Sequence, residues 1–126
     1  YRPRGVDIDR SGSGVILYVA DSYNHRIRKV DVGRSSTFSV NTKSGSGYED
    51  GAVSNARFVY PWDVAVDTYQ RSPEKPLIYV TENGHRVRIV DMLTSTVTTL
   101  AGYPGQASYK DGLRFSARFN NPRGIA

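Results

Sequence analysis

One long segment of this chain occurs twice, and this internal repeat constrains the fold more than any other feature. Residues 18–31 have the sequence YVADSYNHRIRKVD, and about sixty residues later residues 79–91 have the sequence YVTENGHRVRIVD. The neighbouring segments recur in the same order: PRGVDID becomes PWDVAVD, ILYVAD becomes LIYVTE, and YEDGAVSNARFVYP becomes YKDGLRFSARFNNP. We therefore distinguish two units with their connecting loops, 1–60 and 61–121, and the start of a third at 122–126.

Each unit is predicted to form four short strands. Alternating and apolar stretches place them at 6–9, 15–20, 26–31 and 37–40, and in the second unit at 64–67, 77–81, around Val87 and at 96–100. The second strand of each unit is a continuous apolar run between turns, which indicates burial on both faces. The Asp, Asn and Gly residues of DSYN, ENG and the two DG pairs mark turns. No stretch has a sustained helical period, although SNARF and FSARF suit a single helical turn.

Four antiparallel strands repeated at this interval are typical of a β-propeller blade, so we predict an all-β fold built from such blades. One blade cannot bury both of its faces, and a ring closes with roughly four to eight blades. Two blades alone would leave large apolar faces exposed. The chain is thus expected to be a segment of a longer propeller or a subunit that closes a ring by self-association, and the third unit's PRGIA favours the segment.

The composition agrees with this fold and excludes some chemistry. Of the 126 residues 38% are hydrophobic, and nine Tyr, twelve Gly and six Pro suit strands joined by many turns. The chain has no Cys, which excludes disulfides, zinc–thiolate sites and thiol catalysis. A net charge of +5 and an isoelectric point near 9.6 permit an acidic partner such as nucleic acid without requiring one. No apolar run reaches the length of a membrane span.

The repeated residues resemble the NHL repeat. The pattern Pro-x-Gly-Val-x-Ile-Asp, followed by Leu-Tyr-Val-Ala-Asp-Ser-x-Asn-His-Arg-Ile-Arg-Lys-Val, lies within residues 3–30, and the resemblance extends over nearly the whole chain. It implies a propeller, usually of six blades with four antiparallel strands each, in a protein longer than this chain. The second unit departs from the pattern at Glu82, Gly84 and Ile89, which affects turn geometry and surface but not the expected fold.

Residues that recur at the same place in both units are expected to serve the blade itself. The two His residues are predicted to be structural residues of a turn, and neither a metal nor another cofactor is predicted. The Arg residues that follow them are expected to pair with nearby carboxylates or the neighbouring blade, with a row of cations for phosphate as the alternative. The Phe of each ARF sequence is expected to fill the space between blades, and the Asp of each DG pair to cap a turn. The predicted structural set is Asp21, His25, Arg26, Arg28, Glu82, His85, Arg86, Arg88, Asp50, Asp111, Phe58 and Phe119.

Residues that differ between units are better candidates for function. The residue after the first proline of each unit is Arg4, then Trp62, then Arg123. The first strand of a blade should lie nearest the central channel, so these three residues are expected on one rim of the ring. Trp and Arg are the residues most enriched at binding hot spots, although buried packing is the alternative for Trp62. Tyr23, at a turn tip found only in the first unit, is a further candidate.

Three classes of function remain open from the sequence. A non-catalytic scaffold that binds other proteins, or the remainder of its own propeller, is favoured because no G-x-S-x-G, H-E-x-x-H or P-loop sequence occurs. RNA binding is the second, as the resemblance to NHL domains of tripartite-motif-type proteins suggests. Against it, the loops SGSGYEDG and YPGQASYKDG resemble those of extracellular, bacterial and plant or algal members, a weak indication of an extracellular location. The third is a metal-dependent lyase or lactonase, to which the resemblance would assign ligands such as Asp7, Asp9 or Asp67.

Overall fold

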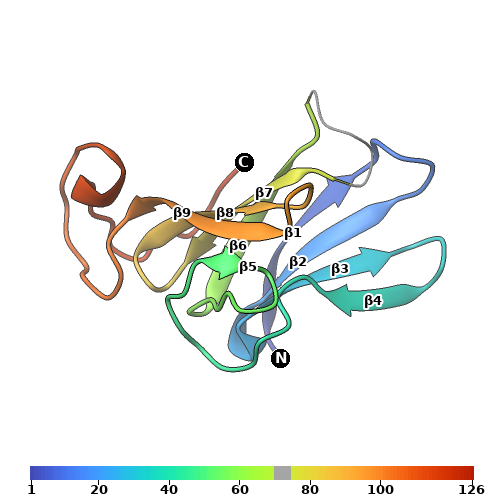
Figure 1. Ribbon diagram of the computed structural model, residues 1–126, viewed down its shortest axis with the longest axis horizontal. Helices are drawn as coiled ribbons and strands as arrows, with labels where there is room; N and C mark the ends of the chain where they lie inside the picture. The colour runs from blue at the N-terminus through green and yellow to red at the C-terminus, as the bar shows by residue number, and fades with distance from the viewer. Residues whose placement is uncertain (70–74) are drawn as a thin grey trace.

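The strands form two antiparallel sheets that lie side by side (Figure 1). In the computed structural model, which describes residues 1–69 and 75–126, the strand orders are β1-β2-β3-β4 and β5-β9-β8-β7-β6. The first sheet consists of β1 (Pro3–Asp9), β2 (Ile16–Asp21), β3 (Arg26–Asp31) and β4 (Ser36–Ser39). The second consists of β5 (Gly51–Ala52), β6 (Pro61–Asp67), β7 (Leu77–Glu82), β8 (Arg86–Asp91) and β9 (Thr96–Gly102). Two short 3₁₀ turns complete the described elements, η1 (Ser22–Asn24) and η2 (Arg114–Ser116).

The predicted blade of four antiparallel strands is confirmed in both units. The connecting loop between the units differs from the prediction. The pair Asp50-Gly51 was expected to form only a turn, but Gly51 begins the fifth strand of the second sheet and pairs with Val97 of β9. This pairing arises because β9 is the outer strand of its sheet, and its free edge accepts the passing loop as a short additional strand.

Corresponding turns in the two units have the same construction, which explains why their registers agree. After β3, the Asp31 carboxylate accepts a hydrogen bond from the Arg34 N–H at 3.0 Å. After β8, the Asp91 carboxylate accepts one from the Leu93 N–H at 2.8 Å. An Asp side chain that binds the backbone two or three residues later stabilises a tight turn locally.

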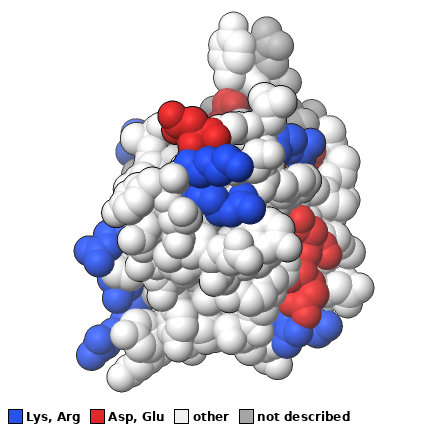
Figure 2. All heavy atoms as spheres, turned by 90° about the vertical axis from the view of Figure 1, so that its left-hand side faces the viewer, with Lys and Arg blue, Asp and Glu red and all other residues white. Residues whose placement is uncertain are grey.

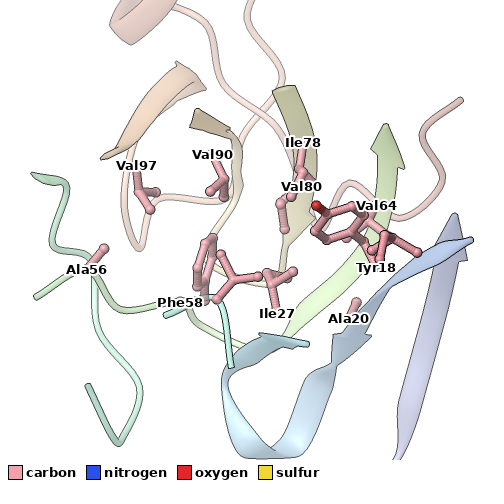
Figure 3. Close-up of a cluster of buried hydrophobic side chains, with 12 residues drawn as sticks. Tyr18, Ala20, Ile27, Ala56, Phe58, Val64, Ile78, Val80, Val90 and Val97 are labelled. Carbon is pink, nitrogen blue, oxygen red and sulfur yellow. The ribbon is translucent and has the colours of Figure 1, made fainter. Parts of the chain in front are cut away.

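The hydrophobic core lies between the two sheets (Figure 3). Tyr18 and Ile27 of the first sheet face Val80 and Val90 of the second, and Phe58 from the connecting loop packs among them. All five side chains are fully buried. The core therefore depends on contacts between two repeat units and on the loop that joins them.

The prediction that the second strand of each unit is buried on both faces holds for one face only. In β2, Ile16, Tyr18 and Ala20 are buried against the other sheet, whereas Leu17 and Val19 on the opposite face are half-buried. The opposite face is less buried because, among the described residues, no further sheet packs against it. The apolar run thus marks a strand with two apolar faces, of which this chain covers one.

Candidate functional site

The first strands of successive units are held side by side. The Val66 N–H of β6 donates a hydrogen bond to Asp7 Oδ2 of β1 at 2.7 Å, and the Ile125 N–H of the third unit donates to Asp63 Oδ2 of β6 at 3.2 Å. Gly5 permits the close approach of β1 and β6, because a Cβ atom at this position would lie 2.6 Å from the Asp63 Cα. The residues that follow the first proline of each unit are thereby brought to one edge of the molecule.

Arg4, Trp62 and Arg123 form a stack at this edge. The guanidinium carbon of Arg4 lies 3.5 Å from the centroid of the Trp62 ring, and that of Arg123 lies 4.6 Å from it. Trp62 is half-buried, while both Arg residues are exposed. Within residues 1–69 and 75–126, neither guanidinium group donates a hydrogen bond or forms an ion pair. The stack therefore holds two cations in place and leaves their N–H groups open to a ligand.

Two shallow recesses flank the stack. One of about 180 Å³ is lined by Arg4, Gly5, Trp62, Asp63, Arg123 and Gly124. The other, of about 150 Å³, is lined by Arg4, Ser22, Tyr23, Tyr60, Trp62 and Asn83. Trp62 and Arg4 line both recesses, and Tyr23 lines the second. All four residues that the sequence singles out for binding therefore lie around one continuous surface, which we call the rim site.

Aromatic residues extend the rim site beyond Tyr23. The ring of Tyr23 contacts those of Tyr1 and Tyr60 edge to face, at centroid distances of 5.5 and 5.3 Å. The guanidinium group of Arg2 lies 5.1 Å from the Tyr23 ring. Sequence reasoning missed Tyr1, Arg2 and Tyr60, although their place just before the first proline of a unit is a signal that would have identified them.

The acidic residue at the rim site does not neutralise the arginines. Asp63 Oδ1 accepts a hydrogen bond from the Val64 N–H at 2.9 Å, and Asp63 Oδ2 accepts the one from Ile125 described above. Both carboxylate oxygens are thus used by the backbone. Within the described residues Asp63 forms no ion pair with Arg4 or Arg123, and the two guanidinium charges exceed the one carboxylate charge at the rim site.

The recurrent Arg residues of the second unit form a buried network with the connecting loop. Arg86, Arg88 and Glu82 are fully buried, and Glu82 Oε1 accepts a hydrogen bond from Arg86 Nε at 2.6 Å. Burial lowers the pKa of Arg86 and the neighbouring Arg88 adds to this, while the charge of Glu82 opposes it. We call residues 47–58 linker one. The two guanidinium groups donate, at 2.9–3.1 Å, to three carbonyl oxygens of linker one, those of Tyr48, Glu49 and Arg57.

Asp50 of linker one joins this network and does not cap its own turn as predicted. Asp50 Oδ1 accepts a hydrogen bond from Arg88 at 2.6 Å, and Asp50 Oδ2 accepts one from the Thr99 N–H at 2.9 Å. The prediction failed because the turn packs against β8 and β9, whose donors reach the carboxylate. The corresponding Asp111 is exposed, and its side chain makes no hydrogen bond within the described part of the chain.

The same positions of the first unit are not covered in this way. Arg28 lies 3.6 Å from Asp21, and Arg26 donates to Ser39 Oγ at 3.1 Å. Asp21 accepts hydrogen bonds from the Tyr1 nitrogen at 2.6 Å and from the Asn24 side chain at 2.9 Å. These side chains are thus paired within their own unit only.

The recurrent His residues connect each unit to the next. His25 Nδ1 accepts a hydrogen bond from the Tyr60 N–H at 3.1 Å, and His85 Nδ1 accepts one from the Asn121 N–H at 3.2 Å. Both donors, Tyr60 and Asn121, stand immediately before the proline of the following unit. Burial lowers the pKa of His25, which favours the neutral ring that this contact requires.

The two recurrent Phe residues differ in burial. Phe58 is fully buried between the sheets, whereas Phe119 is half-buried beside Gly102.

Within linker one, Arg57 binds Glu49, and the hydrogen bond from Arg57 lowers the pKa of Glu49 to about 2. This pair holds the two ends of linker one together.

The acidic residues of the first strands serve the backbone. Asp7 accepts the Val66 N–H, Asp9 accepts the Ser11 N–H at 2.8 Å, and Asp67 accepts the Tyr69 N–H at 2.8 Å. Among the described residues, no three His, Cys, Asp or Glu side chains gather as a metal site would require. The same residues contain no helix that is long and apolar enough to cross a membrane.

Charged side chains form small separate groups on the face of the molecule that lies at the left of Figure 1. Figure 2 shows that basic and acidic side chains lie there in separate small groups, some next to a group of opposite sign, on a largely uncharged surface. Over the described residues of that face, they do not form the continuous basic stripe that follows a nucleic-acid backbone.

Comparisons with known proteins agree with the repeat and the fold. No protein-family model matches the chain. NHL repeat-containing protein 2 of Bos taurus is 30% identical over 136 residues, which cover 98% of this chain and 18% of that protein. Crystal structures called an auxiliary nutrient binding protein are similar too. The one from Bacteroides thetaiotaomicron has a TM-score of 0.75 and 25% identity, over 95% of this chain and 31% of that chain. The one from Bacteroides ovatus has a TM-score of 0.75 and 27% identity, over 88% of this chain and 29% of that chain. The chain therefore spans less than a third of each of these proteins.

Proposed function

Since the chain belongs to the NHL-repeat β-propeller family, we propose that it is a non-catalytic protein-interaction segment of a larger propeller and that the rim site is its contact surface. The observation that carries this proposal is the stack of Arg4 and Arg123 on Trp62, with both guanidinium groups unpaired within the described residues. An arrangement that holds two cations on an aromatic ring without neutralising them is of use to a ligand rather than to the blade.

The chemistry of the rim site favours a protein segment with a carboxylate. A guanidinium group binds a carboxylate through two parallel N–H···O bonds, which are among the stronger hydrogen bonds in proteins. The flanking recesses of about 180 and 150 Å³ each have room for part of one side chain. We therefore expect an acidic side chain against Arg4 or Arg123 and an apolar or aromatic neighbour against Trp62 or Tyr23.

The similar solved structures support binding as the general task. They are called auxiliary nutrient binding proteins, which names a binding role for those proteins. We infer the partner of this chain from the residues of its own rim site and not from the names of those proteins. Truncation of a hot-spot Arg or Trp typically costs a binding interface about 2 kcal/mol or more, so each of the three stacked residues should matter.

RNA binding is the second candidate, and the same stack favours it. Arg and aromatic side chains together form the platform on which single-stranded bases stack, and the isoelectric point of 9.6 permits it. The two candidates differ in their response to salt. When a protein contacts several phosphates, the logarithm of its affinity falls steeply and linearly with the logarithm of the salt concentration. A single carboxylate contact gives a much shallower dependence.

Trp62 fluorescence provides the test, because Trp62 is the only Trp in the sequence. The full chain is titrated with the capped peptide Gly-Glu-Phe-Glu-Gly, with Gly-Gln-Phe-Gln-Gly, and with an oligouridylate. We expect a saturable change with the Glu peptide that Arg4→Ala and Arg123→Ala abolish. The matched control Arg10→Ala alters an exposed Arg just beyond the far end of β1 and should bind normally. Saturation by the oligouridylate alone, with a steep salt dependence, replaces the proposal by RNA binding, and no response to any probe refutes both.

A further inference from the structure

The two loops that follow the sheets have the same backbone construction. Linker one is residues 47–58, and we call the equivalent residues 108–119 linker two. In each linker the N–H of the first residue donates to the carbonyl of the last at 3.2 Å. In linker two, Lys110 and Arg118 also pair as an antiparallel bridge, which makes a small hairpin with its tip at residues 111–117. The two linkers can therefore be compared position by position.

The two linkers differ in the character of the side chains that they expose. At two positions linker two carries a large apolar residue in place of a small one, and at two others it carries a cation. The differing pairs are Glu49 and Lys110, Ala52 and Leu113, Val53 and Arg114, and Ser54 and Phe115. All four of these residues of linker two are exposed. Linker two thus has a more apolar and more basic surface than linker one.

Packing between units does not account for this apolar surface. Linker one joins two sheets that are both present in the described chain, yet its Ala52 and Ser54 are exposed. The same two positions of linker two carry Leu113, which is 87% exposed, and Phe115, which is 52% exposed. A linker with a sheet on either side of it leaves these positions in solvent. We therefore expect Leu113 and Phe115 to stay exposed when a further unit follows.

Two cations accompany the apolar side chains of the tip. The guanidinium carbon of Arg114 lies 5.3 Å from the centroid of the Phe115 ring. Lys110, at the base of the tip, is exposed and forms no ion pair within the described residues. Asp111 is the acidic residue of the tip, and its equivalent Asp50 directs both carboxylate oxygens at β8 and β9 of the adjoining sheet. The exposed tip thus presents apolar side chains together with positive charge.

The backbone of the tip is already bonded within the loop. The Leu113 carbonyl accepts a hydrogen bond from the Ser116 N–H at 2.7 Å. The Arg118 guanidinium group donates to the carbonyls of Phe115 and Ala117, at 2.5 and 2.9 Å. A carbonyl that leaves water without a donor is costly, and these three carbonyls have one each. The tip can therefore move its apolar side chains out of water at little cost to its own backbone.

We propose that the tip of linker two binds the surface of a membrane that contains anionic lipids. Leu113 and Phe115 insert beneath the lipid headgroups, and Lys110 and Arg114 contact the anionic groups above them. The strength of such binding grows with the apolar area that is buried and with the attraction of basic side chains to anionic lipid. The proposal uses no residue of the rim site, so it stands or falls separately from the proposed function.

The shape of the tip favours a lipid surface over an acidic protein partner. Linker two projects from the sheets at the left end of the molecule (Figure 1), and residues 105–116 are all exposed. A projecting apolar side chain needs a matching cavity on a protein partner, which must be built for it. The acyl region of a bilayer receives such a side chain at any point of its surface. The positive charge suits both partners, so the projecting shape decides between them.

The test is flotation of the full chain with vesicles of phosphatidylserine and phosphatidylcholine in equal parts, and with vesicles of phosphatidylcholine alone. Leu113→Ala combined with Phe115→Ser gives linker two the residues of linker one and should lower the partition coefficient roughly tenfold or more. The control Phe38→Ser removes an apolar side chain of β4 that is 57% exposed and should bind normally. Lys110→Glu combined with Arg114→Gln should abolish the preference for phosphatidylserine.

A fluorescent label locates the surface that binds. The sequence has no Cys, so Ser116→Cys gives a single thiol beside the tip, and Asn55→Cys gives one at the equivalent position of linker one. Both parent residues are exposed. With a polarity-sensitive fluorophore on each thiol, we expect phosphatidylserine vesicles to shift the emission to the blue at residue 116 and not at residue 55.

Three results would overturn the proposal. The first is the absence of flotation with either kind of vesicle. The second is flotation that the Leu113→Ala and Phe115→Ser variant retains, or equal shifts at residues 55 and 116, because another surface then binds the lipid. The third is a shift at residue 116 with the acidic amphipathic peptide Glu-Leu-Leu-Glu-Glu-Leu-Leu but not with vesicles, which assigns the tip to a protein partner.

Discussion

Replacing Arg88 by Ala should destabilise the chain far more than replacing Arg28 by Ala, although both residues hold the same place in the repeat. Arg88 is fully buried and binds two carbonyls of linker one, the Asp50 carboxylate and Glu82. Removing one partner of a buried ion pair costs about 3–5 kcal/mol. Glu82 keeps its pair with Arg86, and the Asp50 side chain is 40% exposed, so we take the lower end, about 3 kcal/mol.

Arg28 is the matched control. Its side chain is 32% exposed and lies 3.6 Å from Asp21, without a direct hydrogen bond. Ion pairs of this kind contribute less than about 1 kcal/mol. The two substitutions delete the same atoms at the same strand position, so a difference between them reports the environment and not the residue type.

Urea unfolding, followed by Trp62 fluorescence and circular dichroism, measures both losses. With an m value of about 2 kcal/mol per M, Arg88→Ala should lower the midpoint by about 1.5 M and Arg28→Ala by at most about 0.5 M. Arg88→Lys should be intermediate, because it keeps the charge but lacks the planar fork that reaches two carbonyls. Similar midpoints for the two Ala variants, at unchanged m, would refute the claim that the connecting loop depends on Arg88.

Three further predictions concern the contacts between units. Stability should fall as pH is lowered from 7.5 to 5, because burial lowers the pKa of His25 below 6.5 and the unfolded chain therefore takes up the proton first. In melting curves at the two pH values, His25→Gln should weaken this dependence. An unchanged dependence would count against the His25–Tyr60 contact. In urea unfolding, Phe58→Ala should lower the free energy of unfolding by about 3–5 kcal/mol and Phe119→Ala by clearly less, since of the two only Phe58 is fully buried. Equal losses would show that the core does not centre on linker one. Gly5→Ala should lower the free energy of unfolding by about 1–3 kcal/mol, because the new Cβ would meet Asp63. Gly14→Ala, which has open space around it, should leave the melting temperature nearly unchanged. Identical effects of the two substitutions would contradict the close approach of β1 and β6.

The strands were predictable because their signals are local. Alternation around Val6 and Val64, the apolar runs that contain Tyr18 and Tyr79, and the Asp-containing turns each depend on a few adjacent residues. The strand at Gly51 was not predictable in this way. It exists because the edge of β9 is free to pair, which is a contact between distant parts of the chain.

The rim site was predictable in its members but not in its geometry. Comparison of the units identified Arg4, Trp62 and Arg123 as the positions that vary. Their stacking required β1, β6 and the start of the third unit to lie side by side, which depends on Gly5 and on the hydrogen bonds of Asp63. A sequence pattern records which residues occupy equivalent positions, whereas the distance between those positions is set by the packing of whole sheets.

The buried Arg pair illustrates a different limit. Arg26 and Arg28 lie in HRIRKVD and Arg86 and Arg88 in the similar HRVRIVD, yet only the second pair is buried. The environment of an Arg residue in this repeat is decided by the unit before it, which supplies the linker. For this reason the residue types alone could not distinguish an exposed cation from the centre of a network.

The linker also explains why arginine, and not an apolar residue, suits these buried positions. Linker one packs against the second sheet, and three of its carbonyl groups accept hydrogen bonds from the Arg pair of that sheet. A buried carbonyl without a donor is costly. An apolar side chain at residue 88 would remove the hydrogen bond to the Arg57 carbonyl and one of the two to the Glu49 carbonyl, which also accepts from the Arg57 N–H. A guanidinium group carries five N–H donors in one plane, enough to serve carbonyls of the linker and the carboxylates of Asp50 and Glu82 together. The Arg pair of one unit and the Asp-Gly linker of the preceding one are thus two halves of a single interface, so a change in either half should be tolerated only when the other half changes with it.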